Sequence, residues 1–416
     1  MVNPSDKIKN LPPYLFGVID ILKAGAFAKK LDVIDLAMGN PDLPTPPAVV
    51  ERLIDTVTNH PRTHRYPQAK GMPKFRRAVA IWYKKRFGVT IAPETEAVAL
   101  IGSKEGLAHL CQAYLNQGDV VLVPNPCYPV HYNSVILAGG VVHSMPLLPE
   151  NGFLPVLTDI PEKVRRQAKI MLLNYPNNPT GAVIEDVKFL EEVVRFAKKY
   201  GIIVVYDNAY SEVTFSGYSA PSFLEIKGAK DVGVEFGSFS KTYNMAGWRL
   251  GWAVGNSEVL SVLAKYKSYV DYGVPTFIQL SGVRALETGR NEIERTLAEY
   301  EKRFDFFTKK LNSLGWDAKK PKATMYLWTK IPHPYENMPS LEFAELLIET
   351  TGIAVTPGAG FGTYGEGFVR MAMVTHFKRF HDAFLRLRKF LKVPALSLPE
   401  YPEVKKSVRK RKCRKK

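Results

Sequence analysis

The middle of the chain alternates short apolar segments with amphipathic ones, and this alternation strongly limits the folds that the chain can adopt. Short segments rich in β-branched residues and bounded by Gly, Pro or Asn are typical of buried strands. Five such segments are 97–102, 120–124, 169–176, 201–210 and 232–240. Helical segments lie between strands at 103–115 and at 186–201, which ends at Gly201. The pattern predicts a mostly parallel α/β sheet, in which ligands bind at the carboxyl ends of the strands.

The pattern changes at about residue 286. Residues 287–315 form one long predicted helix, which ends at Gly315. It leads into two apolar segments, 325–331 and 368–374, and two helical ones, 340–352 and 379–391. This order predicts a smaller α+β domain beyond a connecting helix. A chain of 416 residues, 46% of them hydrophobic, has enough apolar residues for a large core and is too long for one ordinary domain.

The three cysteines, Cys111, Cys127 and Cys413, are odd in number, far apart and without a Cys-x-x-Cys pair. This argues against a disulfide framework or a cysteine zinc site and fits a reducing compartment. The first 16 residues lack the apolar core of a signal peptide, and no apolar run approaches the roughly 18 residues of a membrane span. We therefore expect a cytoplasmic protein with no membrane partner and no metal.

The net charge of +17 is concentrated at one end of the chain. Residues 404–416 contain nine Lys or Arg and no acid. A basic run at a terminus is typical of a solvated segment. Residues 393–416, rich in proline and then in basic residues, are predicted as a disordered tail. The alternative is an arm that binds anions or nucleic acid, and we do not expect a nucleic-acid partner.

The segment SFSKTYNMAGWRLG places Lys241 directly after a predicted strand. Ser238, Ser240 and Arg249 supply two hydroxyls and a planar fork of N–H donors, which suits a phosphate dianion. A lysine whose pKa is lowered by burial and a nearby cation can form a Schiff base with an aldehyde. Pyridoxal phosphate carries both an aldehyde and a phosphate. The alternative is an ordinary solvated lysine.

Such a cofactor needs further groups, and the sequence offers a candidate for each. A carboxylate must hold the proton on the pyridine nitrogen; Asp207 ends an apolar run, although it would also serve as a helix cap or turn residue. Tyr210 and Asn178, in NYPNNPTG, are candidate donors to the ring oxygen. The composition of NYPNNPTG is equally typical of a plain turn.

The phosphate and the ring face need contacts as well. GSKEG (102–106) follows a strand and opens a helix, where backbone N–H groups bind anions. Tyr128 in NPCYP is a candidate for stacking on the ring, and its alternative is an ordinary core tyrosine. Each feature is modest alone, but all of them lie at predicted strand ends, and plain turns and core packing do not explain that coincidence.

Together these motifs resemble the class I pyridoxal-phosphate-dependent aminotransferases, the family that shares the aspartate aminotransferase fold. The matching segments are GNPD, YPQAKGMPKFRRA, GSKEG, NYPNNPTG, YDNAY, SFSKTYNMAGWRLG and FVRMAM, and the resemblance covers about residues 10 to 392. It implies fold type I of these enzymes: a mostly parallel central sheet with helices on both faces and a smaller α+β domain. It implies pyridoxal 5′-phosphate as the cofactor.

The resemblance assigns the chemistry to particular residues. Lys241 would hold the cofactor as a Schiff base and then move the proton of the substrate α-carbon. Asp207 would pair with the pyridinium, and Tyr210 would donate to the ring oxygen; these three are the expected catalytic residues. Asn178 would contact both the cofactor and the substrate. Arg370, in FVRMAM, would bind the substrate α-carboxylate in a bidentate manner.

Other residues would hold the phosphate and the rest of the substrate. Ser238, Arg249 and the backbone of Ser103 and Lys104 would bind the phosphate, and Tyr128 would cover the ring. Tyr66, in HRYPQAKG, resembles the tyrosine that reaches the phosphate of the neighbouring subunit, which implies a homodimer with shared sites. The remaining substrate contacts are expected from two residues, Gly39 and Tyr14.

The implied domain boundaries follow the family. Residues 1–45 would pack with the small domain, 46–285 would form the large cofactor-binding domain, 286–392 the small domain with its long helix, and 393–416 the tail. The substrates would be an amino acid and a 2-oxo acid in a ping-pong cycle.

The branch is less sharply defined than the family. PPYLF, IGSKEGLAHL, SFSKTYNMAGWR and KSYVDYG look most like the bacterial alanine (glutamate–pyruvate) transaminases, near the LL-diaminopimelate aminotransferases. Tyr14 and Tyr272 are candidates for lining the side-chain pocket, or for packing between domains. Alternatives are LL-diaminopimelate or aspartate transamination, a β-lyase on the same fold, and a non-catalytic regulator. A nucleotide-binding protein is disfavoured because no Gly-x-Gly-x-x-Gly follows a first strand.

Overall fold

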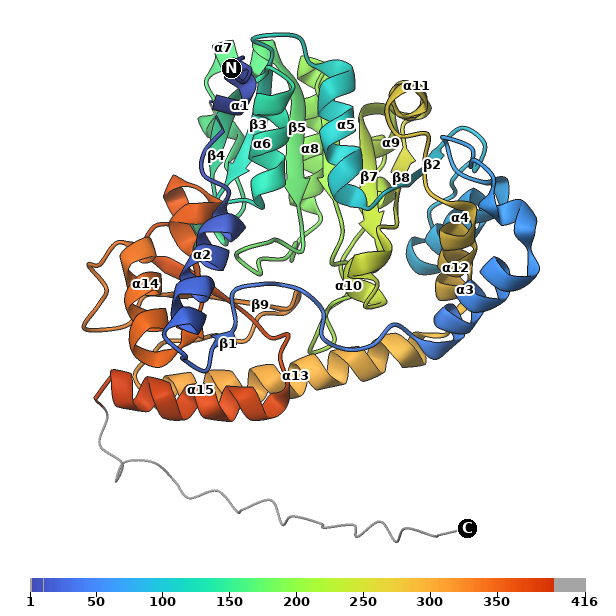
Figure 1. Cartoon of the computed structure of the whole chain (residues 1–416). Helices are drawn as coiled ribbons and strands as arrows, with labels where there is room; N and C mark the ends of the chain where they lie inside the picture. Colours follow the sequence, from blue (N-terminus) through green and yellow to red (C-terminus); the bar gives the residue numbers. More distant parts are fainter. Residues whose placement is uncertain (1, 10, 393–416) are drawn as a thin grey trace, which may run out of the picture.

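The computed structural model describes residues 2–9 and 11–392 (Figure 1). The predicted tail, 393–416, and Cys413 lie outside the described residues. Cys111 and Cys127 are both buried free thiols. Within the described ranges, no helix is long and apolar enough to span a membrane.

The centre of the molecule is a seven-stranded sheet in the order β2-β8-β7-β6-β5-β3-β4. Its strands are β2 (Ala97–Leu100), β3 (Val120–Asn125), β4 (Val141–Pro146), β5 (Ala168–Asn174), β6 (Ile203–Asp207), β7 (Gly233–Ser238) and β8 (Gly251–Gly255). β8 is antiparallel to both of its neighbours, and the other pairs are parallel. The mostly parallel sheet is therefore confirmed.

The five predicted strands all form, with ends that differ from the predicted ones by up to three residues, and the sequence reasoning missed two. β4 is an edge strand whose side chains are mostly half-exposed or exposed, so its apolar signal is weak. β8 has glycine at both ends and starts two residues after Arg249, within the motif that contains Lys241. Glycine is typical of turns, so the sequence of β8 did not indicate a strand.

Helices cover both faces of the sheet. They are α3 (Pro47–Asn59), α4 (Pro73–Phe87), α5 (Ser103–Tyr114), α6 (Pro129–Leu137), α7 (Glu162–Gln167), α8 (Lys188–Tyr200), α9 (Ala229–Val232), α10 (Phe239–Thr242), α11 (Ser257–Val270) and α12 (Thr276–Glu287). α8 ends where Gly201 adopts a left-handed conformation, as its sequence predicts.

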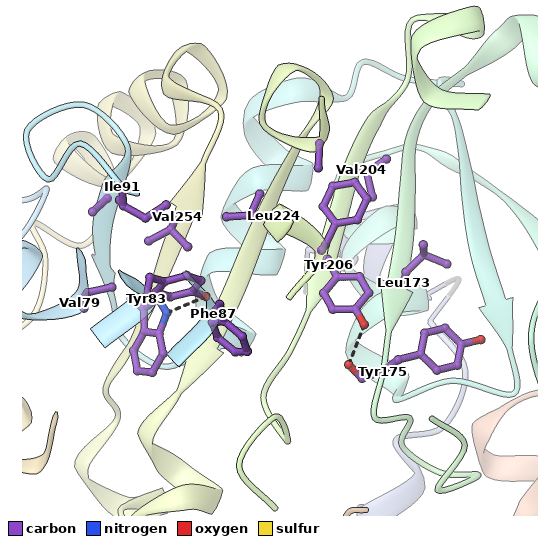
Figure 2. Packing of buried hydrophobic residues seen from close by; sticks show 14 of the residues in the cluster. Val79, Tyr83, Phe87, Ile91, Leu173, Tyr175, Val204, Tyr206, Leu224 and Val254 are labelled. Carbon is purple, nitrogen blue, oxygen red and sulfur yellow. Dashed lines mark hydrogen bonds between the residues drawn. The ribbon is translucent and has the colours of Figure 1, made fainter. Parts of the chain in front are cut away.

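The two faces of the sheet have separate cores because successive strand residues point to opposite sides. Met171 and Leu173 of β5 belong to the core under α4 and α8. Ile170 and Leu172 of the same strand belong to the core under α5, α6 and α11. Figure 2 shows part of the first core, where Tyr83 and Tyr206 lie among aromatic and aliphatic side chains, such as Phe87 and Val204.

The C-terminal part has its own elements and its own core. They are α13 (Arg290–Asn312), β9 (Tyr326–Lys330), α14 (Ser340–Thr351), β10 (Ile353–Ala354), β11 (Thr356–Pro357), β12 (Phe368–Ala372) and α15 (Phe377–Phe390). β11, β12 and β9 form a three-stranded antiparallel sheet. In Figure 1, α13 runs below the rest of the molecule and lies against α15.

The N-terminal segment packs against this C-terminal part. It contains α1 (Asp6–Lys9), α2 (Leu15–Ala28) and β1 (Ile34–Asp35). β1 pairs in parallel with β10. Ile19 of α2 shares a small core with Ile348 of α14, and Leu36 belongs to the core under α13. Chain segments more than 300 residues apart therefore meet beside the carboxyl ends of the central strands.

Candidate active site

The last residues of three neighbouring parallel strands line one cavity of about 510 Å³. They are Asn174 of β5, Asp207 of β6 and Ser238 of β7. Thirteen of the fifteen residues that the sequence singled out line this cavity: Tyr14, Gly39, Ser103, Lys104, Tyr128, Asn178, Asp207, Tyr210, Ser238, Ser240, Lys241, Arg249 and Arg370. The other two, Tyr66 and Tyr272, are outside it.

Lys241 lies on α10, the single turn of helix that follows β7. Its Nζ donates a hydrogen bond to the carbonyl oxygen of Gly39 at 2.5 Å. Burial lowers the pKa of Lys241, and the positive charges of Arg370 and Arg249 lower it further. A lysine in this setting is more easily neutral, and therefore nucleophilic, than a solvated one.

Asp207 is buried, with 5% of its surface exposed. Its Oδ2 lies 3.1 Å from Nε2 of His131 on α6. Its Oδ1 is buried and has no hydrogen-bond partner among the described residues. No helix begins at Asp207, so a capping role is wrong. A buried carboxylate oxygen without a donor is costly, and this one faces a cavity.

Tyr210 and Asn178 are hydrogen-bonded to each other. Nδ2 of Asn178 donates to the Tyr210 hydroxyl at 3.3 Å, and Oδ1 of Asn178 accepts from Nη1 of Arg370 at 2.7 Å. The motif that contains Asn178 is also a turn, closed by a hydrogen bond from the N–H of Gly181 to the carbonyl of Asn177. NYPNNPTG is therefore a turn, and it places Asn178 in the cavity beside Tyr210, while the contact of Asn178 with the cofactor stays a prediction.

Arg370 lies on β12 and has only 1% of its surface exposed. Nη2 donates to the carbonyl of Ala37 at 2.9 Å, while Nε is buried and without a partner in the described chain. Its guanidinium carbon lies 4.1 Å from the ring centre of Tyr326 and 4.6 Å from that of Phe361. Burial lowers the pKa of Arg370, and nearby tyrosines oppose this effect.

Another part of the cavity wall is formed by the first backbone N–H groups of α5 and by the guanidinium of Arg249. Ser103 and Lys104 are the first residues of α5, so their N–H groups point out of the helix start. A Cβ on the preceding Gly102 would lie 2.6 Å from Nη2 of Arg249. Gly102 and Arg249 both have positive φ angles, +75° and +53°. Only glycine at position 102 leaves the guanidinium in its place.

Three tyrosines that the sequence singled out, Tyr128, Tyr14 and Tyr272, differ in burial and in position relative to the cavity. Tyr128 is the residue before α6, and burial raises the pKa of its hydroxyl. Tyr14 is half-exposed and lies 5.5 Å from Nζ of Lys104, measured from its ring centre. Tyr272 does not line the cavity within this chain; its ring instead contacts Tyr66 edge to face at 5.8 Å.

Comparisons with known proteins place this geometry in a family. The family model for aminotransferase class I and II matches residues 31–379. The chain belongs to this family. It is 48% identical over 385 residues to the LL-diaminopimelate aminotransferase of Moorella thermoacetica, covering 92% of this chain and 97% of that one. It is 45% identical over 391 residues to the glutamate-pyruvate aminotransferase AlaC of Escherichia coli, covering 94% of each.

A solved structure agrees with the family assignment. The substrate-bound structure of BacF from Bacillus subtilis superposes on this aminotransferase with a TM-score of 0.89 and 40% identity, covering 94% of this chain and 98% of that one. The α/β fold and the pyridoxal-phosphate dependence that the sequence predicted are confirmed at the level of the family.

The residues of this aminotransferase fit that cofactor. The unpartnered oxygen of Asp207 suits a protonated ring nitrogen, because it is a buried acceptor that lacks a donor. The start of α5 and the Arg249 guanidinium, with Gly102 between them, suit a phosphate. Lys241, with its lowered pKa, suits an aldehyde partner.

Three further residues of the aminotransferase line or back this cavity and were missed in the sequence. Asn174 stands inside the NYPNNPTG motif, and its Oδ1 accepts the N–H of Asn178 at 2.9 Å. His131 follows Tyr128 by three residues, which is a helical spacing that could have been noticed. Tyr326 begins β9 in a segment that reads only as apolar, so its position depends on tertiary structure.

Proposed function

We propose that this aminotransferase moves an amino group between L-alanine or L-glutamate and a 2-oxo acid in two half-reactions, by a ping-pong cycle. The observation that carries the proposal is one cavity that brings together the amine of Lys241, the unpaired carboxylate oxygen of Asp207 and the buried guanidinium of Arg370. Amine, carboxylate and guanidinium are the groups that transamination of an amino acid needs.

The cofactor, when bound, supplies an aldehyde that links to amines and a protonated ring that accepts the charge left on the α-carbon. Asp207 would keep the ring nitrogen protonated, and His131 would hold that carboxylate in place from behind. Tyr210 and Asn178 would contact the ring oxygen, and Tyr128 would cover the ring face. Ser238, Arg249 and the N–H groups of Ser103 and Lys104 would hold the phosphate.

Arg370 and Lys241 would act on the substrate. Two N–H groups of Arg370 are occupied by Asn178 and Ala37, which fixes the guanidinium plane and leaves its other donors for the α-carboxylate. The Gly39 backbone would add a contact beside it. Lys241, once displaced from the cofactor, would be a free amine near the α-carbon and would move its proton.

The side-chain preference rests on the charges at the cavity mouth. In the described chain, Arg249 and Arg370 are the arginines of this cavity, so no additional arginine in this subunit faces a substrate side chain. Apart from Lys241, which the cofactor would occupy, Lys104 beside Tyr14 is the remaining basic residue of the cavity and would attract the distal carboxylate of glutamate. A small methyl side chain needs no such partner, so alanine fits as well.

LL-Diaminopimelate is the second candidate. Its distal end carries both an ammonium and a carboxylate. Asp20 also lines the cavity and, together with Lys104, would offer one charge of each sign. Relatives at 45 to 48% identity carry that activity in their names. Aspartate transamination has no comparable support in the cavity.

We propose that the active form is a homodimer with shared sites. Tyr66 is 90% exposed in the single chain and lies outside its own cavity. The exposed Tyr272 contacts Tyr66 edge to face, and Ile54 and Tyr269 are further large exposed side chains with apolar surface. In the homodimer, Tyr66 would reach the phosphate in the partner's site.

We also propose a cytoplasmic location and the domain division at about residues 45, 285 and 392.

The homodimer has a direct test. Two inactive variants, Lys241→Ala and Tyr66→Ala, are denatured together and refolded as a mixture. If sites are shared, the mixed dimer contains one site with an intact Lys241 and an intact Tyr66. About a quarter of the wild-type activity should then return, because half of the dimers are mixed and each has one complete site. No recovery beyond the separate variants would contradict shared sites.

The substrate proposal is tested by visible absorbance of the purified holoenzyme. Alanine, glutamate, aspartate and LL-diaminopimelate are added separately with no oxo acid present. We expect alanine and glutamate to convert the cofactor band to that of its amine form, and Lys241→Ala to lack the covalent linkage and nearly all turnover. Conversion by LL-diaminopimelate alone would favour the second candidate. Pyruvate and ammonia released without an acceptor would indicate a β-lyase.

A further inference from the structure

Tyr326 occupies a central place in the cavity that no residue motif announced. It is the first residue of β9, and its side chain is almost fully buried while still lining the cavity. Its hydroxyl lies 3.2 Å from the hydroxyl of Tyr210. The guanidinium carbon of Arg370 lies over its ring, 4.1 Å from the ring centre. One side chain therefore contacts both a proposed cofactor donor and the proposed carboxylate site.

Gly39 makes room for this side chain. A Cβ on Gly39 would collide with the Tyr326 hydroxyl. The carbonyl of the same Gly39 accepts the hydrogen bond from Nζ of Lys241. The glycine of the GNPD motif thus lets a small-domain tyrosine and the lysine approach each other, which explains on steric grounds why the smallest residue stands there.

We propose that Tyr326 is a positioning residue with two separable parts. Its hydroxyl donates to the Tyr210 oxygen, so that the Tyr210 proton is free for the cofactor ring oxygen. Its aromatic ring holds the guanidinium plane of Arg370 for the substrate carboxylate. The inference rests on the proposed function and extends it to a residue outside the motifs.

The charges around the hydroxyls of Tyr210 and Tyr326 bear on which of the two donates the hydrogen bond between them. Burial raises the pKa of Tyr326, but the positive charges of Lys241 and Arg370 outweigh that effect and bring the pKa below its usual value. Burial raises the pKa of Tyr210 well above its usual value, and Tyr326 adds to the rise. Either hydroxyl can donate across the 3.2 Å between the two oxygens. Because the more acidic hydroxyl is the better donor, we infer that the hydrogen bond runs from Tyr326 to Tyr210.

The titratable and charged groups that interact with Tyr326 come from five places in the fold. They are Tyr128 before α6, Tyr210 after β6, Lys241 on α10, Tyr300 on α13 and Arg370 on β12. Loss of the Tyr326 hydroxyl leaves all of these in place and removes only the donor to Tyr210. The ring oxygen of the cofactor then receives a weaker hydrogen bond, and the linkage to Lys241 retains its proton to a higher pH.

The first test is a pH titration of the visible absorbance of the holoenzyme, compared between wild type and Tyr326→Phe. We expect the midpoint to rise by about 0.5 to 1 pH unit, the size of one hydrogen bond. The KM for the amino donor should change less than about twofold, because the ring that faces Arg370 is kept. Tyr326→Leu should also raise that KM by about tenfold, since it removes the ring.

The matched control is Tyr300→Phe. Tyr300 is fully buried in the core under α13, and its hydroxyl has no hydrogen-bond partner in the described chain. Its removal should leave the midpoint unchanged. A midpoint in Tyr326→Phe that is unmoved, lowered, or moved equally in the control would overturn the inference while the proposed function stands. A wild-type protein that shows no cofactor band would overturn the proposed function itself.

Discussion

Replacing Arg370 with lysine separates the charge of this residue from its geometry. The guanidinium has five N–H donors. Two are engaged, one with Asn178 Oδ1 at 2.7 Å and one with the Ala37 carbonyl at 2.9 Å, and Nε has no partner in the described chain. A lysine keeps the positive charge but has three donors on one atom, and it cannot satisfy these acceptors and a carboxylate in the same plane.

The magnitude follows from that count. The long-range attraction for the substrate carboxylate is retained, while about one charge-assisted hydrogen bond is lost, worth roughly 1.5 to 3 kcal/mol. The KM for the amino donor and for the oxo acid should therefore rise by about 10- to 100-fold. The cofactor affinity should change little, because Arg370 is hydrogen-bonded to Asn178 and Ala37 and does not contact the proposed phosphate site at Arg249 through any of these bonds.

The assay is steady-state kinetics with each substrate varied, beside Arg303→Lys as a control. Arg303 is also a buried arginine of the C-terminal part, and it pairs with Asp42 and Glu299 outside the cavity. Arg303→Lys should lower stability without raising KM. An Arg370→Lys enzyme with an unchanged KM, or an equal rise in the control, would refute the carboxylate role of Arg370.

Three further results are expected. Gly102→Ala should weaken pyridoxal phosphate binding by about tenfold or more in a titration of the cofactor-free protein, because Cβ would lie 2.6 Å from the Arg249 guanidinium; Gly88→Ala, also at positive φ but with open space around it, should not. Lys241 of the cofactor-free protein should react with an amine reagent at lower pH than exposed lysines, measured by peptide mass spectrometry, because burial lowers its pKa; labelling only at the pH of the others would contradict this. Removal of residues 404–416 should leave activity unchanged in the same kinetic assay, and a folded but inactive truncation would show that the tail contributes.

The residues with local signatures could be predicted from sequence. Asp207 is the last residue of β6, and Lys241 and Asn178 lie within a few residues of the ends of β7 and β5. A strand end in a parallel sheet is already a place near other strand ends. These polar or ionisable side chains stand next to apolar segments, and that contrast identified them as candidates in the sequence. Asn174 was hidden inside a motif that was otherwise noticed, and Tyr326 had no local signal because an aromatic residue in a strand is ordinary.

Sequence alone determined the alternating elements, the family and the candidate residues of the site, because hydrophobic periodicity and reactive side chains are properties of short segments. Only the tertiary structure decided which distant segments share the cavity. Gly39, Lys241 and Tyr326 are far apart in the chain, and they meet because the N-terminal segment and β9 pack beside the ends of the central strands. The lowered pKa of Lys241 has the same origin, since burial and the charges of Arg370 and Arg249 exist only in the folded chain.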